Sequence, residues 1–176
     1  EITPVEDPAA DWRLDVFTGS VRLPSLINDY MAARSDVMDE YHKDGITAGF
    51  LCYPLSGFDG EDRGKRILDF RDSLQETLQK TVGDDAITFL GGATGLYYGY
   101  LDFIAWDLPA VLDAARAFFA GTDLTWGSFH VFRRDMRAVR LWKQKEPKTD
   151  PETGSLLSAK DIETLESFDD GVSGYF

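Results

Sequence analysis

The side chains best suited to binding or to chemistry gather in one aromatic stretch near the middle of the chain. Residues 96–106 read LYYGYLDFIAW, in which Tyr98, Tyr100, Asp102 and Trp106 lie an even number of positions apart. Side chains alternate between the two faces of a β-strand, so we expect these four to share one face. Aromatic rings and a carboxylate on an open sheet face form a platform for a binding partner. The alternative is that the N-terminal helix or the C-terminal tail of the same chain packs on this face.

A second candidate for binding is the acidic segment FDGED. Its carboxylates are Asp59, Glu61 and Asp62, in a loop rich in glycine and acid. Their spacing differs from that of a calcium-binding loop, so we assign no metal to them. We include them in a predicted partner-binding set together with the aromatic platform, and the alternative is an ordinary solvated loop.

The sequence gives weak signals for catalysis. His42 and His130 are the only histidines and lack the spacing of metal ligands, and Cys52 has no basic neighbour in sequence that would activate its thiol. No Walker loop, dinucleotide fingerprint or nucleophile elbow is present. We therefore assign no catalytic residue, no metal and no cofactor. The alternative is a small-molecule-binding protein or enzyme with a pocket on the sheet face, lined by Tyr98, Tyr100, Asp102 and His130.

The charge of the chain favours a basic partner. The formal net charge is −13, and residues 1–132 carry 22 acidic and 10 basic side chains. Such a body repels nucleic acid and anionic membranes and attracts basic proteins, although solubility alone also explains it. Residues 133–148 are the exception, with seven basic side chains against two acidic ones. We expect this basic stretch to be solvated or to pair with acids of the same chain; the alternative is a site for phosphate or an acidic partner.

Length and composition indicate a single domain. With 176 residues, of which 43% are apolar, the chain can bury one core but is too short for two ordinary domains. No apolar run is long enough to span a bilayer, and a single cysteine favours the cytoplasm. The chain opens at Glu1 without Met, which leaves a removed export signal open. We expect a loose N-terminal arm over residues 1–10, one domain over 11–145, and an acidic tail with a short helix over 146–176.

The order of predicted elements indicates an α+β fold. The expected strands are 12–17, 46–54, 87–92, 96–106, 128–132 and 138–142, with a hairpin turn at 93–95, and the expected helices are 24–43, 66–82 and 108–120. From residue 46 to 132 the order is strand, helix, strand, strand, helix, strand, which is that of a ferredoxin-like split βαβ sheet. An N-terminal strand and helix and a C-terminal hairpin would extend it. We expect Leu101 and Phe103 on the helix-covered face, opposite Tyr98 and Tyr100.

Residues 97–103, YYGYLDF, resemble part of the third-strand signature of the RNA recognition motif. The basic residue and the first glycine of that signature are missing here. An acidic body also opposes contact with phosphates. RNA binding is therefore a weaker alternative.

Residues 40–135 resemble a bacterial family of domains related to the regulator of ribonuclease activity B. The matching features are AGFLCYPLSG, the helix beginning at Arg66, ITFLGGATG, and the aromatic strand ending at Asp107 with its helix. The resemblance implies a small, acidic, ferredoxin-like cytoplasmic protein that inhibits an enzyme by binding it. The chain is also similar to small acidic immunity proteins, which neutralise basic toxin domains. Charge and resemblance together predict a non-enzymatic protein-binding module, such as an inhibitor or an immunity protein.

Overall fold

The computed structural model describes Asp15 and residues 17–144. All of these except Gln144 belong to one compact unit, which ends at Lys143. The predicted arm over residues 1–10, the tail over 146–176 and most of the predicted strand 12–17 lie outside the described residues.

The described residues fold into a mixed α+β structure with six strands and four helices. All neighbouring strands are antiparallel, and their order across the sheet is β1-β3-β4-β2-β5-β6. The strands are β1 (Phe17–Val21), β2 (Thr47–Pro54), β3 (Ile87–Gly95), β4 (Tyr98–Ala105), β5 (Trp126–Val131) and β6 (Val139–Lys143). The late predicted strand 138–142 corresponds to β6, which forms one edge of this sheet.

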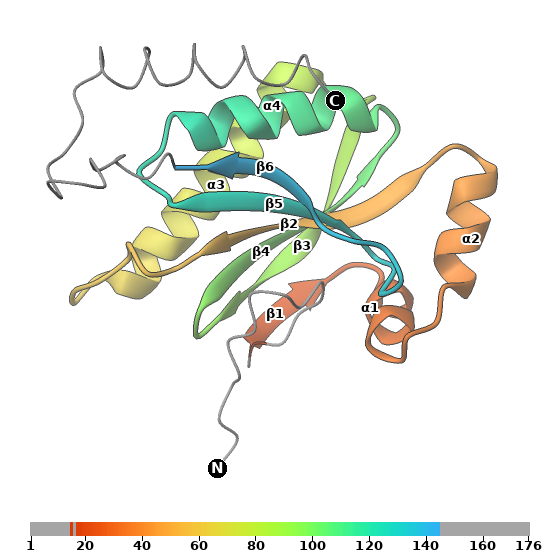
Figure 1. Ribbon diagram of the computed structural model, residues 1–176, viewed down its shortest axis with the longest axis horizontal. Helices are drawn as coiled ribbons and strands as arrows, with labels where there is room; N and C mark the ends of the chain where they lie inside the picture. Colours follow the sequence, from red (N-terminus) through yellow and green to blue (C-terminus); the bar gives the residue numbers. More distant parts are fainter. Residues whose placement is uncertain (1–14, 16, 145–176) are drawn as a thin grey trace, which may run out of the picture. The chain divides into compact units, whose positions relative to one another are not determined.

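Helices cover both faces of the sheet (Figure 1). The helices are α1 (Pro24–Met31), α2 (Asp36–Lys43), α3 (Arg63–Val82) and α4 (Leu108–Ala120). Ile67, Leu74 and Leu78 of α3 and Phe119 of α4 pack on one face. Asp107 caps α4 by accepting a hydrogen bond from the backbone N–H of Ala110 at 3.1 Å, as an N-cap aspartate is expected to do. Of the described helices, none is both long and apolar enough to cross a membrane.

Strand β2 lies in the middle of the sheet and is buried on both faces, as its continuous apolar sequence predicts. Leu51 and Tyr53 join the core on the side of α3 and α4, whereas Phe50 and Cys52 join the core on the side of α1 and α2. The hydroxyl of Tyr53 is buried with no hydrogen-bond partner among the described residues, and burial raises the pKa of Tyr53 above its usual range.

Strand β4 shows the predicted alternation. Leu101, Phe103 and Ala105 belong to the core beneath α3 and α4. Tyr100 and Ile104 point to the other face, where they pack with residues of α1 and α2. The side assignment from the sequence is therefore confirmed.

The predicted hairpin turn at residues 93–95 is wrong by about two positions. Strand β3 continues to Gly95, and the chain turns at Leu96 and Tyr97 before β4 begins at Tyr98. Ala93, Thr94 and Gly95 remain extended because all three pair with β1, and Ala93 and Thr94 also pair with β4. The glycines of this segment fit a turn, but glycine also occurs in strands where two backbones approach closely, as it does here.

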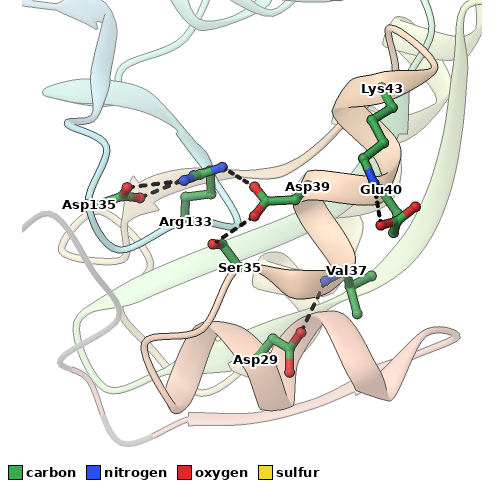
Figure 2. A network of polar contacts seen from close by, with 8 residues as sticks. All are labelled: Asp29, Ser35, Val37, Asp39, Glu40, Lys43, Arg133 and Asp135. Atoms are coloured by element: carbon green, nitrogen blue, oxygen red, sulfur yellow. Dashed lines mark hydrogen bonds and ion pairs between the residues drawn. The ribbon is translucent and has the colours of Figure 1, made fainter.

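The predicted helix over residues 24–43 is two helices. The chain leaves the helical conformation at Ala33, whose φ of 55° is left-handed, and α2 restarts at Asp36. Asp29 stabilises this break. Its Oδ1 accepts from Nε and Nη2 of Arg34 at 3.1 and 2.8 Å. Its Oδ2 accepts from the backbone N–H of Val37, in the first turn of α2, at 3.2 Å (Figure 2).

We predict that Asp29→Ala lowers the free energy of unfolding by about 1–2 kcal/mol, because the first turn of α2 loses a capping acceptor. Urea denaturation of the variant and the wild type measures this loss. Glu40→Ala is the matched control, since Glu40 is an exposed residue of α2 that pairs only with Lys43 among the contacts in Figure 2. Equal effects of the two substitutions would contradict the capping role of Asp29.

Candidate functional site

The turn between β3 and β4 is held by a carboxylate from a distant part of the chain. Asp15 Oδ1 accepts a hydrogen bond from the backbone N–H of Leu96 at 3.0 Å, and its Oδ2 accepts from those of Tyr97 and Tyr98 at 3.0 Å each. Asp15 is buried. Gly95 leaves room for it, because a Cβ atom at that position would overlap the carboxylate. Three bonds to one charged acceptor fix the conformation of this turn.

The loop that precedes α3 lies against the same turn. The backbone N–H of Leu55, just before the loop, donates to the carbonyl oxygen of Tyr97 at 2.8 Å. Nη2 of Arg63, just after the loop, donates to the carbonyl oxygen of Leu96 at 3.3 Å. The two ends of the acidic loop are therefore tied to the turn, although the bonded residues are 42 and 33 positions apart in sequence.

Arg66, in the first turn of α3, holds the backbone of the loop in place. Its Nη1 donates to the carbonyl oxygen of Asp59 at 2.7 Å, and its guanidinium carbon lies 5.9 Å from the ring centroid of Phe58. Phe58 is buried in the core beneath α3. The backbone of the loop is thus anchored, while the carboxylates of Asp59, Glu61 and Asp62 belong to exposed residues.

Turn and loop together form a surface that combines apolar and acidic groups, which we call the turn surface. It consists of Leu96, Tyr97, Asp59, Glu61 and Asp62. Leu96 is 55% exposed and Tyr97 is 37% exposed. Tyrosine and leucine side chains that are exposed in a fixed turn, beside three carboxylates, suit a partner that is basic and has an apolar centre.

The sheet face with Tyr100 and Asp102 is not an open platform, and the alternative, that the N-terminal helical segment of the chain packs there, is confirmed. Tyr100 is 1% exposed and Asp102 is 2% exposed, because this face of β4 lies under the α1 and α2 side of the fold. Tyr30 of α1 fills the space above the neighbouring strand, with its ring edge against Phe50 at a centroid distance of 5.7 Å. The apolar side of α1 has to be buried, and this sheet face is where it packs. Bases of an RNA therefore have no access to the ring of Tyr100.

The remaining platform residues are separated from one another. Tyr98 is half-buried against Trp126 of β5, with ring centroids 5.5 Å apart. Trp106 is 48% exposed but follows the far end of β4, away from Tyr98. Of the predicted platform residues, Tyr98 pairs with Pro54 at the end of β2, a few residues before the acidic loop, and its side chain packs on the α1 and α2 side of the sheet. The role of the platform residues in binding a partner stays a prediction.

Of the groups considered for catalysis, Cys52 and His130 lie on the neighbouring strands β2 and β5, and His42 lies apart from them at the end of α2. His130 stacks on Phe50 with ring centroids 4.8 Å apart, and its Nε2 lies 3.1 Å from Oγ of Ser128. Ser128 and Cys52 are both buried in the sheet, whereas His42 is exposed at the end of α2. No three histidine, cysteine, aspartate or glutamate side chains gather as metal ligands among the described residues.

Part of the basic stretch pairs with acids of the same chain, as expected. Arg133 bridges Asp135 of its own turn and Asp39 of α2 (Figure 2). The hydrogen bond to Asp135 raises the pKa of Arg133 and lowers the pKa of Asp135 from their ordinary values. Arg140 lies over the ring of Trp126 at 5.6 Å. Lys145 and Lys148 lie outside the described residues.

Sequence reasoning missed Asp15 and the two exposed turn residues. Asp15 was part of a predicted strand, and its contacts lie more than 80 residues away, so no local pattern could reveal them. Leu96 and Tyr97 were placed inside a strand because the turn was placed at 93–95. The one signal available in the sequence was that Leu96 and Tyr97 directly follow Gly95, a residue type common next to turns.

Comparisons of the chain with protein-family models, with curated proteins and with solved structures found no match. The resemblance to the family related to the regulator of ribonuclease activity B therefore stays a prediction.

Proposed function

We propose that this chain is a non-enzymatic, acidic protein-binding module that takes a basic partner on the turn surface, as an inhibitor or a toxin-neutralising immunity protein does. The observation that carries the proposal is the fixed turn itself. Leu96 and Tyr97 are exposed on a backbone that Asp15 holds by three hydrogen bonds, directly beside the acidic loop.

The fixed turn and the acidic loop both favour the binding of a basic partner. A turn that is already ordered loses little conformational entropy when a partner docks, so more of the contact energy appears as affinity. Tyrosine is enriched among the residues that dominate binding energy. The carboxylates of Asp59, Glu61 and Asp62 add to the field of a chain with net charge −13, which speeds the approach of a basic protein.

The proposal extends to fold and location. The order β3-β4-β2-β5, with α3 and α4 on one face, supports a ferredoxin-like core that β1 and β6 extend at its two edges. A single cysteine, Cys52, which is buried and is not part of a disulfide, supports a cytoplasmic location. The likeness to the family related to the regulator of ribonuclease activity B is part of the same proposal.

The proposal is tested with two variants of the turn surface. Tyr97→Ala removes the apolar centre and is expected to weaken partner binding at least tenfold. The triple variant Asp59→Asn, Glu61→Gln, Asp62→Asn is expected to slow association and to reduce its dependence on salt, because steering is electrostatic. A partner captured from the source cells at low salt is purified, and its association and dissociation rates are measured with each variant.

The matched control carries the same change of charge elsewhere. Asp69→Asn, Asp72→Asn, Glu76→Gln neutralises three exposed carboxylates of α3. This variant should leave the affinity nearly unchanged. The proposal fails if the captured partner binds the Tyr97→Ala and loop variants as tightly and as fast as it binds the control, or if no partner is captured at low salt.

A further inference from the structure

A cavity of about 350 Å³ lies on the α1 side of the sheet, where β1 joins β3. Ile27 of α1 and Val21 of β1 line it with apolar side chains, and Gly19, Gly92 and Ala93 line it with backbone and a single methyl group. Asp102 of β4, together with Thr18 and Ser20 of β1, completes the lining. Among the described residues that line the cavity, Asp102 is the one with a titratable side chain. This site is separate from the turn surface.

The cavity exists because small residues follow one another on β3. Opposite Asp102 in the ladder stands Gly91, where the register shifts by one residue in a β-bulge. Gly91 has a φ of 149°, and a Cβ atom there would overlap the carbonyl oxygen of Ser20. Ala93, two positions on, offers only a methyl group. No side chain of β3 at these positions is long enough to fill the space in front of the carboxylate.

The carboxylate of Asp102 makes the cavity favour ligands that donate hydrogen bonds or carry a positive charge. Asp102 is 2% exposed and stands among apolar residues such as Tyr100 and Ile104 of its own strand. A buried carboxylate is stabilised by donors and by positive charge. Asp102 already makes an interaction within the chain. Its two oxygens accept about four hydrogen bonds in total, so a ligand can share the carboxylate with that interaction.

We propose that this cavity binds a small organic cation, with a protonated amine on Asp102 and an apolar body against Val21, Ile27 and Ala93. Its volume is at the lower end of the range for ligand pockets, about 300–1,000 Å³. At about 30 Å³ for each water-sized group, it holds on the order of ten non-hydrogen atoms. The net charge of −13 also raises the local concentration of cations.

Calorimetric titration with matched probes tests the proposal. The cations are n-butylammonium, cyclohexylmethylammonium and 2-phenylethylammonium, and the neutral counterpart is cyclohexylmethanol. We expect saturable binding of at least one cation to the wild-type protein and at least tenfold weaker binding of the alcohol. Asp102→Asn should weaken binding of that cation at least tenfold, whereas Asp85→Asn, which neutralises an exposed carboxylate elsewhere, should leave it unchanged.

If Asp102→Asn does not fold, the variant Ile27→Phe and the amide chemical shifts of the wild-type protein test the proposal instead. Ile27→Phe adds a ring at a half-buried position of the cavity wall and should reduce binding at least tenfold by filling the space. In the wild-type protein, amide chemical shifts of Gly19, Gly92 and Ala93 should change on titration with the cation. The proposal is overturned if none of the three cations binds saturably, or if binding leaves these amides unchanged.

Discussion

Tyr100→Ala is expected to lower the free energy of unfolding by about 3–5 kcal/mol, as much as Phe103→Ala. Both side chains are almost completely buried, although they lie on opposite faces of β4. The ring of Tyr100 packs edge-on against Phe50, with centroids 5.9 Å apart, and Phe103 packs against Phe129 at 5.7 Å. Truncation at either position leaves a cavity in one of two cores that share the same strand.

Equilibrium denaturation of the two variants measures these losses. Trp106→Ala is the control, because Trp106 is an exposed aromatic residue next to the same strand and should cost clearly less. Tyr100→Phe keeps the ring and separates its packing from the effect of the hydroxyl group. If Tyr100→Ala costs no more than Trp106→Ala, the α1 and α2 side of the sheet is not a core in solution.

Asp15→Ala is expected to cost about 2–4 kcal/mol, because three backbone N–H groups lose one charged acceptor at once. Gly95→Ala should cost a similar amount, since the new methyl group would displace the carboxylate of Asp15. Because both substitutions remove the same contact, the double variant should cost much less than the sum of the two single losses.

A double-mutant cycle by urea denaturation tests this coupling. Gly57→Ala is the control glycine, because a Cβ atom there would meet nothing within 4 Å. It should change stability little and show no coupling to Asp15→Ala. Additive losses for Asp15→Ala and Gly95→Ala would mean that the carboxylate does not organise the turn. Asp15→Ala and Gly95→Ala should each also weaken the binding of a partner to the turn surface.

The hydrophobic pattern of the central strands was sufficient to predict their positions in the sheet. The apolar run of β2 indicated burial on both faces, and the alternation along β4 correctly placed Leu101 and Phe103 beneath α3 and α4. Asp107 could be recognised as a helix cap because capping is a local interaction. These predictions succeeded because each depends on residues that are close in sequence.

The turn and the closed second face could not be predicted in the same way. The glycines of β3 fit a turn as well as a close backbone approach, and only the pairing with β1 selects the second. Likewise, an even spacing of Tyr98, Tyr100 and Asp102 shows that they share a face but not whether a helix covers it. The break at Ala33 depends on Asp29 meeting Arg34 and Val37, which a helical pattern does not reveal.

Residue types and their spacing were enough to indicate an acidic, mixed α+β protein, the two faces of β4 and the acidic loop before α3. The folded chain was needed to show that Tyr100 and Asp102 are buried, that Asp15 fixes the turn at Leu96 and Tyr97, and that this turn meets the loop. The difference lies in the range of the interactions. Periodicity and capping act within a few residues, whereas the hydrogen bonds that hold the turn and tie the loop to it join residues 33 to 83 positions apart.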